Sequence, residues 1–174
     1  MIVDGGATGL QAGDDMAGRL LAGDLALGGG VARTADGLFF SAFEAANDQL
    51  SLAISGTLAS ETADLRGALS LADLGLVDAR SSGSAGIQIA VDRAAAPASD
   101  APPEDDAERP YAVTASLLVP AGRLAGQPVS GMRVGFAGEA IGDRVAGRLD
   151  GSGELAGQPV EVQAQVTRDG AIYS

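Results

Sequence analysis

The sequence contains no cysteine, histidine or lysine, and each of these absences removes a class of function. Without cysteine there is no disulfide framework, no thiolate nucleophile and no cysteine-ligated zinc site. Without histidine, the usual hydrolase triads and facial metal triads cannot form. Without lysine, neither a Schiff-base lysine nor a phosphate-loop lysine is available. We therefore expect a protein that is not an enzyme and holds no cofactor.

Aromatic residues and positive charge are also scarce. Only 3% of residues are aromatic and the formal net charge is -12, so the interior must be aliphatic and the surface acidic. Nucleic acid is not expected as a partner, because phosphate binding needs a basic stripe. No run approaches the ~20 apolar residues of a membrane helix, and the first residues lack the basic and apolar regions of a signal peptide.

What the sequence does contain is alternation of apolar and polar residues over most of its length. A period of two predicts β-strands with one aliphatic face. Glycine-rich segments separate these strands, and the Asp150-Gly151 and Asp169-Gly170 pairs are typical of hairpin turns. We expect about ten strands of the usual five or six residues. The alternating stretches cover residues 48–58, 63–71, 86–92, 111–120, 131–138, 143–151 and 159–170.

Two stretches, residues 14–23 and 71–79, break the alternation and predict short helical turns. Each is followed within a few residues by a glycine and a strand, in DLALG and GIQIAV. The two strands lie about twice as far apart as the two copies of the hexapeptide LAGQPV, at residues 124–129 and 155–160, which suggests a loose repeat. In LAGQPV, glycine permits a bend and proline is tolerated at the start of a strand, so each copy is expected to join two strands.

Residues 93–110 differ from the rest in composition. They hold most of the prolines and a dense acidic cluster with nothing apolar to bury, which predicts a loop or linker. We expect residues 1–92 to form the first part of a repetitive sheet and residues 111–174 to continue it, truncated at the C-terminus. The fold class is mainly β: a curved, repetitive antiparallel sheet of the open-groove or β-taco type with one or two short helical turns.

Other motifs have a structural interpretation that outweighs the chemical one. The DGGATG segment at residues 4–9 is interpreted as a turn, because a phosphate loop needs a lysine. A calcium site at Glu104, Asp105, Asp106 and Glu108 is disfavoured against a solvated spacer, because no glycine-punctuated ligand loop surrounds them. A carboxylate pair drawn from Glu139, Asp143, Glu154 and Glu161 would suit a carbohydrate-active β-solenoid, although sugar subsites usually need aromatic platforms.

Several stretches of the sequence together resemble the interior repeats of the TamB family. They are the succession from GVARTADGLFFSAFEAANDQLSLAISGTL through LRGALSLADLGLVD, and the later GRLAGQPVSGMRVGFAG and GRLDGSGELAGQPVEVQAQVTRDG. This is the translocation and assembly module family of AsmA-like, bridge-like lipid transfer proteins. The resemblance covers nearly all of the chain outside residues 93–110, but not the family's N-terminal membrane anchor or its C-terminal segment.

The resemblance implies a periplasmic, Gram-negative protein, anchored in the inner membrane when full length, with an Omp85-family partner such as TamA. Its implied function is non-enzymatic: an aliphatic groove for phospholipid acyl chains, supporting outer-membrane protein assembly. Two alternatives remain open, a closed β-solenoid or β-sandwich module of a bacterial surface protein and the carbohydrate-active β-solenoid. The candidate groove residues are Leu50, Leu52, Ile54, Leu65, Leu69, Leu71, Ile87, Ile89, Val91, Val113, Leu117, Val134, Phe136, Val160, Val162 and Val166.

Overall fold

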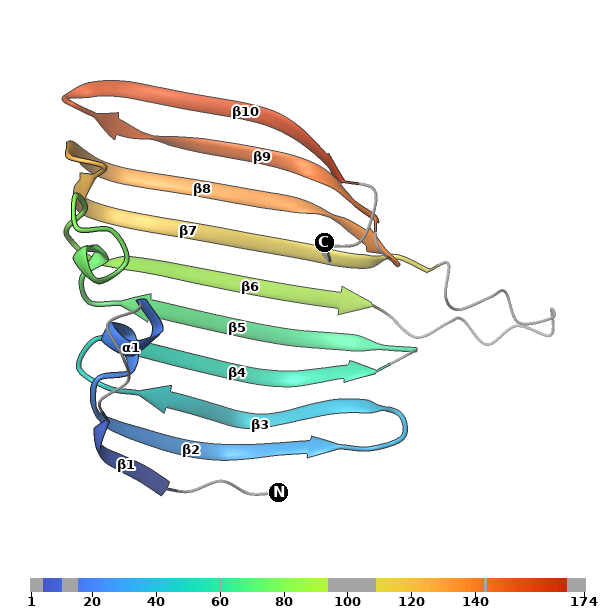
Figure 1. Ribbon diagram of the computed structural model, residues 1–174. Helices are drawn as coiled ribbons and strands as arrows, with labels where there is room; N and C mark the ends of the chain where they lie inside the picture. The colour runs from blue at the N-terminus through green and yellow to red at the C-terminus, as the bar shows by residue number, and fades with distance from the viewer. Residues whose placement is uncertain (1–4, 11–15, 60, 94–108, 143, 169–174) are drawn as a thin grey trace.

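The computed structural model describes residues 5–10, 16–59, 61–93, 109–142 and 144–168, which form strands almost throughout. Two short helical elements interrupt the strands near one end of the sheet (Figure 1). In chain order the elements are β1 (Gly5–Leu10), α1 (Met16–Leu21), β2 (Gly23–Arg33), β3 (Gly37–Ala46), β4 (Leu50–Ala59), β5 (Ala63–Leu71), η1 (Leu74–Leu76), β6 (Ala85–Arg93), β7 (Tyr111–Leu124), β8 (Gln127–Ile141), β9 (Arg144–Leu155) and β10 (Gln158–Arg168).

The strands form one ten-stranded sheet in which every strand pairs with its neighbours in sequence. All nine pairings are antiparallel, so the sheet is a simple meander. The sheet is a single layer and does not close on itself (Figure 1). The expected fold class, an open antiparallel sheet with very little helix, is therefore confirmed.

The alternating stretches of the sequence correspond to strands β4 to β10, and the two predicted helical turns correspond to α1 and η1. The strongest match is β5, whose bounds are those expected, because its aliphatic residues alternate without interruption. Strand β3 was not anticipated. Its register shifts between Phe40 and Phe43, and Ala42 there has a φ of 46°, so a bulge breaks the period of two.

Three local expectations were wrong. The segment interpreted as a turn is strand β1 from Gly5 onward, because its backbone pairs with β2. Asp150 and Gly151 lie inside β9 and form no hairpin turn, since Gly151 pairs directly with Val134 and Val162 on either side. Arg93, assigned to the acidic loop, is the last residue of β6 and pairs with Ala63. The rest of that loop, residues 94–108, and the Asp169-Gly170 pair lie outside the described residues.

The repeated LAGQPV segment joins β7 to β8 and, again, β9 to β10, as expected. In each copy the central Ala-Gly pair has positive φ, 48° and 85° at Ala125 and Gly126 and 51° and 77° at Ala156 and Gly157. Positive φ at both central residues defines the tight type I′ hairpin turn, whose twist matches that of the strands. The two turns lie side by side, and the amide of Ala156 donates to the carbonyl of Pro128, 2.8 Å away.

The small buried core lies at the end of the sheet that carries these turns. It consists of Ala85, Val119 and Val129, with Leu74 of η1 packed against them. The loop around η1 is fixed to the first turn by backbone hydrogen bonds, including those between Ser82 and Arg123 at 3.0 and 2.9 Å. This loop therefore covers the aliphatic side of the sheet at one end and leaves the remainder of that side uncovered by described residues.

Candidate functional site: the aliphatic face

The register of the sheet places all the candidate groove residues on one face, which we call the aliphatic face. Directly paired residues of antiparallel strands project their side chains to the same side. Leu69 of β5 pairs with Leu52 of β4 and with Ile87 of β6. The row continues through Leu117 of β7 to Val134 of β8. The same row reaches Val162 of β10 through Gly151 of β9. Parallel rows on either side contain the other candidates: Leu50, Ile54, Leu65, Leu71, Ile89, Val91, Val113, Phe136, Val160 and Val166.

The aliphatic face is accessible over the middle of the sheet. None of the candidate residues is fully buried, and Ile89 and Val162 are 45% and 54% exposed although neither lies at a strand end. Neighbouring aliphatic side chains shield one another along the rows, which accounts for the intermediate exposure of the others. The η1 loop packs onto this face as a second layer at the end near Val119, and α1 contacts η1 through the Arg19 side chain, which donates to the carbonyl of Leu76 at 3.1 Å. The face thus offers hydrocarbon contact over the middle of the sheet.

Glycines and one aromatic ring shape the aliphatic face between β8 and β9. A Cβ atom built on Gly147 would lie 2.7 Å from the ring of Phe136, and one on Gly138 would lie 2.8 Å from it. The ring therefore covers two backbone positions that have no side chains of their own. At the centre of the sheet, Gly67 stands between Ile54 and Ile89, and a Cβ there would meet nothing within 4 Å. The face is shallow at Gly67.

Three arginines lie on the aliphatic face in the row at the end opposite η1, where Arg33 pairs with Leu38, Arg93 with Ala63 and Arg168 with Val145. Arg93 is only 7% exposed, and its Nη1 donates to the hydroxyl of Tyr111 at 3.0 Å. Its guanidinium also stacks 4.8 Å from the centre of the Tyr111 ring. The Tyr111 hydroxyl in turn donates to the carbonyl of Ala59 at 3.4 Å. The alternation Ile87, Ile89, Val91 continues to residue 93, and this was the signal in the sequence for its position.

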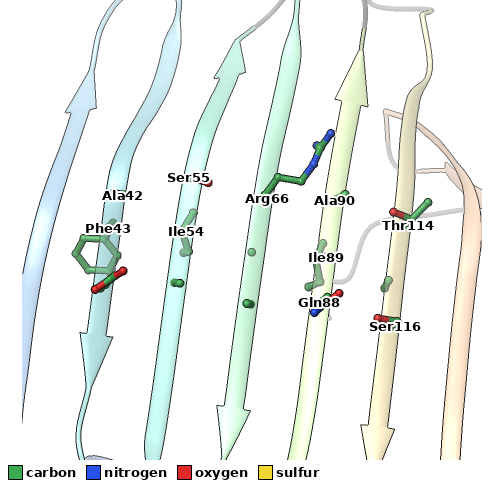
Figure 2. Close-up of a pocket in the computed structure, with 15 residues that line it drawn as sticks. Ala42, Phe43, Ile54, Ser55, Arg66, Gln88, Ile89, Ala90, Thr114 and Ser116 are labelled. Atoms are coloured by element: carbon green, nitrogen blue, oxygen red, sulfur yellow. The ribbon is translucent and has the colours of Figure 1, made fainter.

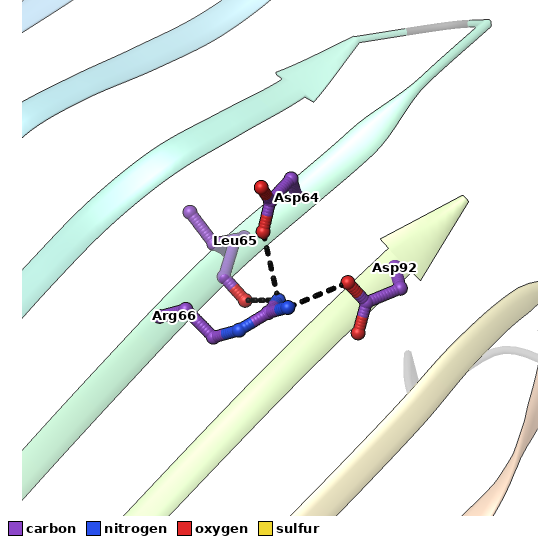
Figure 3. A network of polar contacts seen from close by, with 4 residues as sticks. All are labelled: Asp64, Leu65, Arg66 and Asp92. Carbon is purple, nitrogen blue, oxygen red and sulfur yellow. Dashed lines mark hydrogen bonds and ion pairs between the residues drawn. The ribbon is translucent and has the colours of Figure 1, made fainter. Parts of the chain in front are cut away.

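The opposite face, which we call the polar face, bears the intervening residues. There Arg66 of β5 binds Asp64 of its own strand at 3.0 Å and Asp92 of β6 at 2.7 Å (Figure 3). The hydrogen bond to Asp92 raises the pKa of Arg66 above its ordinary value. All these side chains are about half exposed or more, so the pairs contribute little to stability but keep the charges on this side of the sheet.

Two hollows of the described sheet are lined by polar and apolar side chains together. A hollow of about 490 Å³ spans β3 to β7, and Ser55, Arg66 and Gln88 are among its lining residues (Figure 2). Its lining residues form three successive rows of paired residues across the strands. Side chains of the two outer rows project onto the polar face, and the middle row, which contains Ile54 and Ile89, belongs to the aliphatic face. A second hollow, of about 420 Å³, adjoins the first. Asp150, on the polar face, is the β9 residue in its lining. The aliphatic residues form an exposed surface, and its occupation by hydrocarbon stays a prediction.

The described carboxylates weighed for sugar hydrolysis lie on three strands, β8, β9 and β10. Glu139 pairs with Ala146, eight residues before Glu154 on β9, which corresponds to roughly 27 Å at ~3.4 Å per residue. A catalytic pair needs a separation of only about 5–10 Å. Glu154 accepts a hydrogen bond of 2.6 Å from the Ser130 hydroxyl on β8, and Glu161 lies on β10 two residues beyond Pro159, the direct partner of Glu154. Asp143 lies outside the described residues.

Residues 104–108, considered for calcium, also lie outside the described part of the chain. In that described part, no group of three or more acidic side chains is placed to hold a metal ion. No helix among the described residues is long and apolar enough to cross a bilayer. Comparison of the chain with protein-family models, with curated proteins and with solved structures finds no match.

Proposed function

We propose that this chain is a non-enzymatic segment of a periplasmic, TamB-like lipid conduit, in which phospholipid acyl chains lie along the aliphatic face. The observation that carries the proposal is the aliphatic face itself. It runs across β4 to β10 of an open, single-layer sheet, and its central residue Ile89 is 45% exposed. A contiguous apolar surface of this kind marks an interaction site when it exceeds a few hundred Å².

The energetics favour a hydrocarbon guest. Exposing an acyl chain of ~16 carbons to water costs roughly 12 kcal/mol, at about 0.8 kcal/mol per CH₂ group. Leu, Ile and Val side chains offer no hydrogen bond that would hold a tail at one place, so the guest can slide along a row. The phospholipid headgroup stays in solvent at the margin of the sheet. The open sheet gives no support to the alternative of a closed sandwich or solenoid.

The wider setting of the proposal comes from the resemblance of the sequence to the TamB family. In that setting the full-length protein is anchored in the inner membrane, moves phospholipid towards the outer membrane and supports outer-membrane protein assembly. Its partner there is an Omp85-family protein such as TamA. The described part of the chain contributes one stretch of the hydrophobic path, and the acidic outer surface remains in the aqueous periplasm.

The proposal is tested with a phospholipid that carries a photoactivatable diazirine on its acyl chain. We expect labelling of the purified protein to map to aliphatic-face peptides and to fall at least tenfold in Ile89→Glu, because a carboxylate repels hydrocarbon. The matched control is Gln88→Glu, which adds the same charge to the next residue of β6 on the polar face. Ile54→Glu and Leu69→Glu should behave like Ile89→Glu, with Ser55→Glu and Ser70→Glu as their controls.

Circular dichroism of each variant verifies that the sheet is retained. Equal labelling of Ile89→Glu and Gln88→Glu, or labels that map to the polar face, would overturn the proposal. Native mass spectrometry gives an independent measure, since phospholipid should co-purify with the unmodified protein and be lost from the aliphatic-face variants.

A further inference from the structure

The three arginines of the aliphatic face occupy equivalent places in the fold. Arg33, Arg93 and Arg168 are the last residues of β2, β6 and β10, which point the same way because an even number of strands separates them in the antiparallel meander. Each arginine lies four strands from the next, about 19 Å at ~4.8 Å per strand. We call their row the arginine margin. Its other members are Leu38, Leu58, Ala63, Tyr111, Ala140 and Val145.

Opposite charges lie on opposite faces at this end of the sheet. Asp64, Asp92 and Glu139 belong to the next row, which projects onto the polar face. Asp36, in the turn after β2, forms no ion pair with Arg33 in the described part of the chain. At this end, the described strands therefore place positive charge on the aliphatic side of the sheet and negative charge on the polar side.

Tyr111 gives the arginine margin a second polar group. It is one of two tyrosines in the sequence, and the guanidinium of Arg93 lies 4.8 Å from the centre of its ring and 3.0 Å from its hydroxyl. An arginine whose stem lies on aliphatic surface while its head stays at the edge is typical of a border between hydrocarbon and water. Tyrosine and arginine also flank the hydrocarbon at the headgroup level of membrane proteins. The margin has the composition of such a border.

We propose that the arginine margin binds the phosphate of an anionic phospholipid whose tails lie along the strands and point towards η1. This inference rests on the proposed function and adds to it the orientation and the charge of the lipid. Arg33 and Arg168 are exposed, and a guanidinium can donate two parallel hydrogen bonds to phosphate oxygens. Arg93 is nearly buried, so it contributes its positive charge at the centre of the margin while it keeps its contact with Tyr111.

The length of the uncovered face suits this orientation. Along β6, Arg93 and Ile87 are six residues apart, about 20 Å at ~3.4 Å per residue. A lipid tail occupies half of the ~30 Å hydrocarbon core of a bilayer, or about 15 Å. It therefore fits between the margin and the η1 loop, where Leu74 packs on Ala85 and Val119. The reverse orientation would place the phosphate against these apolar side chains, without a hydrogen-bond donor to replace water.

The test uses two photoactivatable phosphatidylglycerols in neutral detergent, one with a diazirine on the headgroup and one with a diazirine at the end of a tail. Peptide mapping should place the headgroup label near Arg33, Tyr111 or Arg168 and the tail label near Ile87. The double variant Arg33→Gln, Arg168→Gln should lower headgroup labelling by about tenfold, because each arginine loses its charged hydrogen bonds.

The matched control is the double variant Arg133→Gln, Arg148→Gln. It removes the same charge from two exposed arginines of the polar face and should leave labelling unchanged. The same probes made with phosphatidylcholine, which has no net charge, should respond less to the loss of Arg33 and Arg168. Excess inorganic phosphate should not displace the phosphatidylglycerol probes, because the tails supply most of their affinity. Circular dichroism verifies that every variant keeps its sheet.

The outcomes separate this inference from the proposed function. Tail labelling on the aliphatic face with the headgroup label near η1, or with equal effects of the two double variants, would overturn the orientation and leave the proposed function standing. Displacement by inorganic phosphate would show a site for a free anion and would also overturn the inference. Failure of both probes to label the aliphatic face would remove the proposed function and this inference together.

Discussion

The ring of Phe136 in β8 lies against the backbone of Gly147 in β9, so that a Cβ atom at residue 147 would come within 2.7 Å of it. Gly147→Ala must therefore displace both the ring and the neighbouring carbonyl of Ala137, which would lie 2.6 Å from the added Cβ. We expect a loss of about 1–3 kcal/mol in the free energy of unfolding, as for other overpacked sites. Urea denaturation followed by circular dichroism measures this change.

The control is Gly67→Ala, in the middle of the same face, where an added Cβ meets nothing within 4 Å. Alanine there restricts the unfolded chain without a clash, so stability should rise by about 0.4–1 kcal/mol. Equal losses at residues 67 and 147 would contradict the role assigned to the ring.

The hairpin turns offer a stabilising change. Ala156 has a φ of 51°, a left-handed conformation that costs an L-residue with a Cβ roughly 1–2 kcal/mol. Ala156→Asn creates the Asn-Gly pair that type I′ turns prefer, and should stabilise the protein by about 1 kcal/mol. Ala146→Asn, at an exposed position near the start of β9, should instead destabilise because asparagine is unfavourable in strands. A shift of the urea midpoint in the same direction for both variants would count against the turn assignment.

Asn47 connects α1 to the turn between β3 and β4. Its Nδ2 donates to the carbonyl of Leu20 at 2.9 Å, and its Oδ1 accepts from the amides of Gln49 and Leu50 at 2.9 and 2.7 Å. Asn47→Asp keeps the acceptor but loses the donor and places a negative charge beside the C-terminal carbonyls of the helix. We expect a loss of about 1–3 kcal/mol, measured by denaturant unfolding. Gln49→Glu, which adds the same charge two residues away, should cost much less.

Asp78 gives the η1 loop a dependence on pH. Hydrogen bonds from the amide of Arg80 and the hydroxyl of Ser81 lower the pKa of Asp78 below its ordinary value. Because the folded-state pKa is depressed, the stabilisation is complete above the unfolded pKa of ~3.9 and is lost as pH falls through the folded value.

Asp78→Asn should therefore loosen the loop at pH 7 and differ little from the unmodified protein near pH 2. Amide hydrogen exchange at Arg80 and Ser81, with each rate divided by its intrinsic rate at that pH, follows this directly. Asp36→Asn changes the same charge in the exposed segment between β2 and β3 and should leave exchange at these amides unaltered. A constant difference between Asp78→Asn and the unmodified protein from pH 7 to pH 2 would refute the linkage.

The sequence was sufficient to predict the strands from β4 to β10 and the face on which the aliphatic residues lie, because alternation with a period of two encodes both. It was insufficient where the backbone departs from that period. The bulge between Phe40 and Phe43 hid β3. Gly151, which follows an aspartate, suggests a turn locally, yet it stands in a strand beside Val134 and Val162, where its missing side chain leaves them room.

The environment of Arg93 and the position of the hollows depend on contacts between distant segments. Tyr111 is separated from Arg93 by the acidic segment in sequence, and only the pairing of β6 with β7 brings the two together. The hollows depend on how large and small side chains are arranged on neighbouring strands. On β5 and β6, for example, Arg66 pairs with Ala90 and Ala68 pairs with Gln88. Neither relationship leaves a periodic trace in the sequence.

The meander has a mechanical consequence. In the described sheet each strand pairs only with the strands before and after it, so no strand pairing joins β1 to β10. Tension applied to the two termini should peel hairpins away one after another from the outside inward, giving a staircase of short extensions at low force. Single-molecule stretching would record this as a sawtooth of small steps, where a sandwich of similar size ruptures in one large event.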